Sequence, residues 1–150
     1  MRFMLILKAT GYSEAGVKPG QAHSEAMAAY RKSLAEAGAL LAAEELQPSS
    51  AGIRIQYFPG EEQPVFEAGP FVTGQGLLAG YTLIEVISEE EAVNWALRMP
   101  VPQGLGTFGI EVRKLEEQAD YARNPINRAL VADLEDQLEL LKTYLKETKI

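Results

Sequence analysis

Three ionisable side chains are the first candidates for chemistry in this sequence, and they are of two kinds. His23 is the one histidine of the chain, and an imidazole near neutral pH can act as a general base. Glu44 and Glu45 follow an apolar run that predicts a strand, and alternation along a strand turns one of them toward the packed face of its sheet. A carboxyl group that faces a cleft can exchange protons with a bound molecule.

Each candidate also has a purely structural interpretation. His23 falls in the first turn of a predicted helix, where a surface histidine needs no function. Glu44 or Glu45 could pair with Arg54 on the next strand at a solvated strand end. The sequence leaves both interpretations open.

The sequence lacks the residues and motifs that usually bind metals and nucleotides. The chain has no cysteine and one histidine, which excludes thiolate sites and multi-histidine sites within one chain. The glycines between residues 69 and 80 form neither a phosphate loop nor a dinucleotide fingerprint. The acidic run at residues 89–91 is a helix cap, because successive helical side chains diverge instead of converging on an ion. We expect no metal and no cofactor.

Composition bounds the remaining classes. The chain has 150 residues, 47% of them hydrophobic, and a net charge of −7, which predicts a single folded domain and argues against binding nucleic acid or anionic membranes. The sequence shows no apolar stretch long enough to cross a membrane and no secretion signal. We therefore expect a cytoplasmic protein.

The elements that must position these residues follow from periodicity. Apolar runs and two-residue alternation predict strands at residues 2–8, 39–46, 53–58, 64–67, 81–87 and 108–115, although alanine and leucine at residues 39–46 would also suit a continuing helix. Composition predicts loops at residues 10–20 and 69–80. Spacings of three and four predict helices at residues 21–37 and from residue 89 to Met99, the second opened by a Ser88–Glu91 capping box. This order predicts an α+β, ferredoxin-like split βαβ fold with an inserted β-hairpin.

The C-terminal segment predicts a separate helix from Pro125 to about Glu147, with Asn124 as its N-cap. Its apolar residues are spaced three, four, three and four apart, at Val131, Leu134, Leu138, Leu141 and Leu145, which is a coiled-coil seam over two heptads. We expect residues 116–150 to form an extension that docks on the domain of residues 1–115 or on a neighbouring subunit. A free tail that awaits another protein is the alternative.

Several motifs together resemble the YCII-related family, and more narrowly its branch named for an Asp-Gly-Pro-Phe motif. They are Gly69-Pro70-Phe71, the run from Leu78 to Val86, Ser88 to Ala92, Trp95-Ala96, the strands at residues 2–5 and 110–113, and Leu46-Gln47-Pro48. The resemblance covers about residues 1–115. It implies a dimeric α/β barrel, in which two ferredoxin-like sheets pack face to face around a cleft.

This chain departs from the motif, because Ala68 stands where the family has the aspartate. The usual Thr-Lys-Glu that follows is Thr73-Gly74-Gln75-Gly76. Any acid–base role of that aspartate is therefore lost here, and Glu44 or Glu45 would have to supply it.

Two functions fit these features. In the first, a homodimer or a larger oligomer built on it binds a small organic ligand in the implied cleft, with or without catalysis, and Arg54, Phe71, Gln75 and Tyr81 line the site. In the second, the chain is a non-catalytic accessory module that acts through protein contacts. The missing aspartate favours the second function, and the implied cleft favours the first.

Overall fold

The structure is a computed structural model that describes residues 1–72, 76–117 and 125–148. The chain divides into two compact units, Met1–Leu115 and Glu116–Ile150. The elements in chain order are β1 (Arg2–Lys8), α1 (Gly11–Glu14), α2 (Gln21–Glu36), β2 (Leu40–Glu45), the 3-10 turn η1 (Ser49–Ala51), β3 (Ile53–Gln56), β4 (Val65–Ala68), β5 (Leu78–Glu85), α3 (Glu89–Arg98), β6 (Ile110–Lys114) and α5 (Pro125–Glu147).

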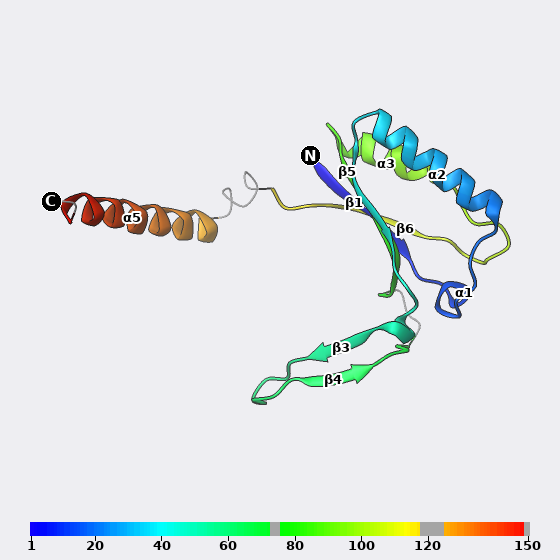
Figure 1. Cartoon of the computed structure of the whole chain (residues 1–150), viewed down its shortest axis with the longest axis horizontal. Helices are drawn as coiled ribbons and strands as arrows, with labels where there is room; N and C mark the ends of the chain where they lie inside the picture. The colour runs from blue at the N-terminus through cyan, green and yellow to red at the C-terminus, as the bar shows by residue number, and fades with distance from the viewer. Residues whose placement is uncertain (73–75, 118–124, 149–150) are drawn as a thin grey trace. The chain divides into compact units, whose positions relative to one another are not determined.

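The first unit is built on a four-stranded antiparallel sheet with the strand order β2-β5-β1-β6. Helices α2 and α3 lie together on one face of it (Figure 1). The continuous apolar run of β1 suits its place in the interior of the sheet, with β5 on one edge and β6 on the other. The predicted ferredoxin-like α+β fold is confirmed.

The core lies between the sheet and the two helices. Alternation along β1 turns Phe3 and Leu5 toward the helices, and the paired residue Ile84 of β5 joins them. The three-and-four spacing of α2 brings Tyr30 and Leu34 onto the same core. These five side chains are almost completely buried, and their burial is the main favourable term in the stability of the unit.

The opposite face of the sheet carries a second, smaller set of apolar residues. Met4, Ile6, Tyr81 and Leu83 share it by register, and none of them belongs to the core cluster. We call this the outer sheet face. Arg2 and Glu85 lie on it at one end of β1 and β5, so the face combines apolar and charged groups.

The start of α3 differs in one detail from the predicted capping box. The Ser88 hydroxyl accepts a hydrogen bond from the Glu91 amide as predicted, at 3.1 Å. The Glu91 carboxylate, however, accepts from the amide of Ile87 at 3.0 Å, one residue earlier than a capping box requires. The extended backbone of Ser88 turns the preceding amide toward the helix.

Two segments are more ordered than the sequence predicts. The stretch of residues 10–20, predicted as a loop, contains α1, which a reciprocal bond pair between Thr10 and Ser13 holds at its start. The irregular loop predicted for residues 69–80 ends earlier, since β5 already begins at Leu78. The first residues of β5 belong to the sheet because β1 extends to Lys8, and Lys8 pairs with Leu78 across a bulge.

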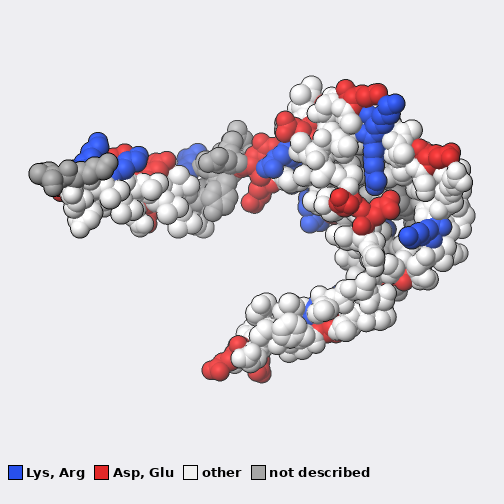
Figure 2. Space-filling model, viewed as in Figure 1, with Lys and Arg blue, Asp and Glu red and all other residues white. Residues whose placement is uncertain are grey.

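The predicted hairpin is present and forms a two-stranded sheet of its own, β3 with β4. It projects from the four-stranded sheet (Figure 1). Acidic side chains gather at its free end (Figure 2), where the turn carries Glu61 and Glu62.

The second unit consists of α5, whose bounds match the predicted helix. Its predicted N-cap, Asn124, lies outside the described residues. The side chains described from Ile126 to Glu147 are all exposed, including those of the predicted seam. Most of the stability of a helix in a protein comes from the packing of its apolar face, so we expect the exposed apolar residues of α5 to contact a partner.

Candidate functional site

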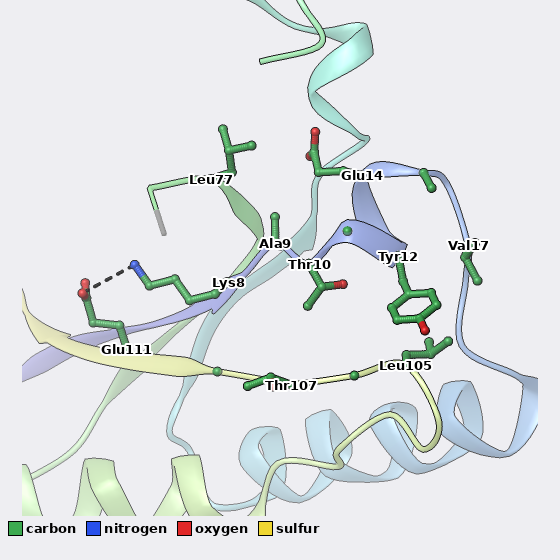
Figure 3. Close-up of a pocket in the computed structure, with 14 residues that line it drawn as sticks. Lys8, Ala9, Thr10, Tyr12, Glu14, Val17, Leu77, Leu105, Thr107 and Glu111 are labelled. Carbon is green, nitrogen blue, oxygen red and sulfur yellow. Dashed lines mark ion pairs between the residues drawn. The ribbon is translucent and has the colours of Figure 1, made fainter. Parts of the chain in front are cut away.

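A cleft of about 1090 Å³ lies where β1 ends. Three segments form its walls: the end of β1 with the following α1, residue Leu77 before β5, and residues 105–111 at the start of β6. Figure 3 shows a charged pair at one end of the cleft and the ring of Tyr12 near Leu105 at the other. Its volume is slightly above the usual range of small-molecule sites, about 300–1,000 Å³.

The charged end is built by the outer face of two paired strands. Lys8 continues the alternation of β1 beyond Ile6, and Glu111 pairs with Ile6 from β6, so both side chains stand on the outer sheet face. The Lys8 ammonium lies 3.6 Å from Oε1 of Glu111, and the Arg113 guanidinium lies 2.7 Å from Oε2. One carboxylate is thus shared by two cations.

The other end of the cleft is apolar. Tyr12, Val17 and Leu105 line it together with Ala9 and Ala15, which directly follow β1 and α1. Gly106, at φ +78°, allows the loop to pass close to the ring, because a Cβ there would lie 3.3 Å from Cε2 of Tyr12. The polar groups on this wall are the hydroxyls of Thr10 and Thr107 and the phenol of Tyr12.

Glu14 lines the cleft but its carboxylate points away, toward the root of the hairpin (Figure 3). There it accepts hydrogen bonds from the amide and the hydroxyl of Ser49. The Ser49 hydroxyl oxygen in turn accepts from the amide of Phe71, at 3.0 Å. Gly69 must be glycine at this point, because a Cβ would lie 1.7 Å from the carbonyl oxygen of Ser49. The cleft wall and the hairpin root are therefore one hydrogen-bonded structure.

The two candidate glutamates of β2 point to opposite faces. Glu44 pairs in register with Tyr81 on the outer sheet face. Glu45 turns to the helix-covered face, where its carboxylate lies 3.5 Å from Arg31 of α2. Neither glutamate pairs with Arg54, the structural interpretation considered above, because Arg54 lies in the separate hairpin sheet.

Two of the four ligand-binding candidates lie together at the hairpin root. The Arg54 guanidinium stacks over the ring of Phe71 at 4.0 Å and lies 4.0 Å from Glu67. Tyr81 is on the outer sheet face, in another part of the unit. Gln75 lies outside the described residues. The structure thus groups Arg54 with Phe71, and Glu44 with Tyr81, and neither pair lines the cleft.

His23 lies apart from all of these residues. It lines a second, smaller hollow of about 390 Å³, formed by the first turn of α2 and the chain after α3. Pro19, Ala26, Pro100 and Val101 make this hollow mainly apolar. The assignment of a catalytic role to His23, Glu44 or Glu45 stays a prediction.

Sequence reasoning missed Lys8, Tyr12 and Glu111. Lys8 could have been found as the charged residue that ends an apolar strand, and Glu111 as a charged residue that alternates with apolar ones in the last strand. Tyr12 gave no signal, because its position depends on the short helix α1. Among the described residues no group of three or more potential ligand side chains could hold a metal ion, and no described helix has the length and apolarity to cross a membrane.

A family model of the YCII-related domain matches residues 1–117, which is the part of the chain that carries the sheet, the hairpin and the cleft. No protein with a curated description matches the chain. The narrower relation to the branch named for Asp-Gly-Pro-Phe stays a prediction; Ala68, in the place of its aspartate, is an exposed residue at the end of β4, paired with Ile53. Because the family model spans most of its length, the chain belongs to the YCII-related domain family.

Proposed function

We propose that the protein binds a small organic acid in the cleft at the end of β1. The observation that carries this proposal is the division of the cleft into an apolar end, at Tyr12 and Leu105, and a charged end, at Lys8 and Glu111. Ligand sites of this kind bury an apolar body and use a few polar groups to orient it. A ligand with an aromatic or aliphatic body and one ionic group fits this cleft, with its body at the apolar end and its ionic group at the charged end.

The positions of the ion pairs at the charged end support an anionic ligand. Glu111 lies 2.7 Å from Arg113, which does not line the cleft, and 3.6 Å from Lys8, which does. The longer of the two contacts is that of Lys8, and its ammonium is the cation that lines the cleft. The carboxylate of Glu14, which also lines the cleft, is turned toward Ser49 and occupied by its two donors. In this proposal a ligand carboxylate competes with Glu111 and the other contacts of Lys8 for a charge-assisted hydrogen bond to the Lys8 ammonium.

Calorimetric titration with three probes of one shape tests the charge. Indoleacetate, indoleacetamide and tryptamine present an anionic, a neutral and a cationic end on the same ring. We expect indoleacetate to bind roughly tenfold more tightly than the amide, because a charge-assisted hydrogen bond exceeds a neutral one by about 1–1.5 kcal/mol. Tryptamine should bind least.

Matched variants locate the effect. Lys8→Met should remove the preference for the anion, whereas Lys32→Met, the same change on the exposed surface of α2, should keep it. Glu111→Gln should strengthen binding of indoleacetate, because it removes the carboxylate that competes for Lys8. Equal affinities for the three probes, or an unchanged preference in Lys8→Met, would contradict the proposal.

The same proposal includes a homodimer in which two outer sheet faces cover each other. Register places Met4, Ile6, Tyr81 and Leu83 at the centre of this face. Ile6 is buried and the other three are partly exposed, and pairing of two such faces would remove their remaining apolar surface from water. Since Lys8 and Glu111 stand at the margin of the same face, the cleft would open beside the seam. Light scattering should give a particle of twice 16.4 kDa; a 16.4 kDa particle at micromolar concentration would refute the pairing.

If the protein also catalyses a reaction at the seam of this dimer, Glu44 is the acid–base group that we propose, although it does not line the cleft of a single chain. Its register partner Tyr81 and its place on the outer sheet face would put it in the dimer seam, whereas Glu45 is turned to the other face and paired with Arg31. Once a reaction is identified, Glu44→Gln should abolish its pH dependence and Glu45→Gln should leave it unchanged. Full activity of both variants across the pH range would exclude both residues.

The hairpin favours a second candidate, an accessory module that acts through protein contacts. Ile53, Ile55 and Phe66 share one face of the hairpin by register, and Ile53 and Phe66 are 70% and 67% exposed. A two-stranded sheet of this size is marginal alone, so a partner could complete it. Replacing Ile55 and Phe66 by Thr should leave binding of indoleacetate intact; loss of biological function with intact ligand binding would favour this candidate.

A further inference from the structure

Helix α5, taken by itself, carries four leucines in a stripe along one side. Leu134, Leu138, Leu141 and Leu145 repeat at alternating distances of four and three residues, and each is 55–59% exposed. In heptad terms Leu138 and Leu145 are a positions, and Leu134 and Leu141 are d positions. Such a stripe is the contact surface of a helix that packs against another helix.

We propose that α5 pairs in antiparallel orientation with α5 of a second copy of this chain. In this arrangement Leu134 packs in one layer with Leu145 of the second copy, and Leu138 packs with Leu141 of the second copy. The two-fold symmetry repeats both layers, so four layers of leucine form without a polar residue among them. This goes beyond the proposed ligand binding and does not depend on it.

The charges beside the stripe select the orientation. Glu135 and Lys142 occupy the two e positions next to the leucines, and e positions face each other across an antiparallel pair. Glu135 of each copy therefore meets Lys142 of the other, which makes two pairs of opposite charge. A parallel pair would instead place Glu135 beside Leu130, and Lys142 beside Gln137, of the second copy, which makes none.

The existing contacts of these side chains leave the pairing possible. Lys142 lies 3.6 Å from Glu139 in its own helix, but both side chains are largely exposed, and an exposed pair of this kind contributes little. Gln137 donates to Asp133 within the helix, on the side away from the e positions. Because four layers span only about 17 Å of helix, the helices benefit from any contact elsewhere that raises their effective concentration.

Cysteine cross-linking tests both partner and orientation in the full-length protein, and the absence of native cysteine removes any background. We expect a mixture of Leu134→Cys and Leu145→Cys chains to form a disulfide-linked dimer under mild oxidation, because these positions share a layer. Either variant alone should cross-link poorly. In the antiparallel pair Leu145 lies roughly 16 Å along the axis from Leu145 of the second copy, and a disulfide needs Cα atoms within about 7 Å.

A matched control uses Asp133→Cys mixed with Lys146→Cys, which lie at the same level of the helix but on its outer side, and should not cross-link. Cross-linking of Leu145→Cys with itself would overturn the antiparallel orientation, and no linkage above the control mixture would overturn pairing itself.

The charge pairs are tested in the mixture of Leu134→Cys and Leu145→Cys chains. Glu135→Lys in both chains should lower the disulfide-linked fraction at early times by about tenfold, since both charge pairs become repulsive. Adding Lys142→Glu should restore it, and Asp136→Lys on the outer side should change little; failure of the restoration would overturn the charge argument.

Discussion

Tyr30 should make the stability of the domain fall at high pH. Its hydroxyl donates to the carbonyl oxygen of Trp95 at 2.6 Å, and the two rings meet edge to face with centroids 6.2 Å apart. That carbonyl is in the last turn of α3, where the amide of Met99 donates to Ala96 instead. Tyr30→Phe therefore leaves a buried carbonyl without its donor, which costs about 1–2 kcal/mol.

The pH dependence follows from the same burial. Burial raises the pKa of Tyr30 to about 12, and the nearby positive charge of Arg98 opposes this only in part. In the unfolded chain the phenol titrates at about 10. Below pH 10 both states keep the proton and the hydrogen bond contributes in full. Between pH 10 and 12 only the unfolded state loses the proton, so the stability falls as the pH rises.

Urea unfolding followed by the fluorescence of Trp95, the one tryptophan, measures both effects. At pH 8 the Tyr30→Phe variant should be less stable than the wild type by about 1–2 kcal/mol. By pH 11 the gap should narrow by roughly 1.4 kcal/mol, because the wild type alone loses the contribution of the buried phenol. Tyr57→Phe, at a position 80% exposed, is the control and should change neither value. A gap that stays constant from pH 8 to pH 11 would refute this reasoning.

Two further predictions concern the root of the hairpin. Glu14→Gln should weaken the hydrogen bonds to Ser49 and speed amide exchange in residues 53–68 by roughly tenfold. The control Glu45→Gln loses only an exposed ion pair and should leave that exchange unchanged. Equal exchange rates in both variants and the wild type would contradict the role of Glu14 in holding the hairpin. Gly69→Ala should lower the melting temperature by at least about 5 °C because its Cβ has no room, and Gly76→Ala, which meets nothing within 4 Å, should not; a wild-type melting curve for Gly69→Ala would contradict the close approach.

Much of the fold is predictable from local patterns. The strand from Arg2 to Lys8 and the helix after Ser88 show strong periodicity and clear end signals, and the structure has both. The hairpin follows from alternation on either side of a Pro-Gly turn. These elements are set by short-range chemistry, and their order alone then limits the topology.

The choice between Glu44 and Glu45 shows what local patterns miss. In β2 the register shifts between Leu40 and Ala42, so one extra residue on that strand reverses which side chains face the helices. Leu40 pairs with Ile84 of the core, and Glu44, four residues later, faces the opposite side. Regular alternation would have placed both on one face. A bulge depends on the pairing of two strands distant in sequence and leaves no pattern of its own.

The cleft was unpredictable for a related reason. Its lining comes from residues near 8, near 12 and near 105, which meet only after the sheet has formed. The position of Tyr12 depends on the four-residue α1 and on the bond pair between Thr10 and Ser13 that holds it. Two of the predicted ligand-binding residues, Arg54 and Phe71, instead stack on each other at the hairpin root.

Amide NMR of the full-length protein during titration with indoleacetate tests the central claim most directly, because it locates the ligand without reference to activity. We predict saturable shifts in residues 8–12 and 105–111, on the two sides of the cleft, and their loss in Lys8→Met. Saturable shifts confined to other segments, such as the hollow beside His23 or the hairpin, would contradict the claim. So would the absence of any saturable shift in residues 8–12 and 105–111.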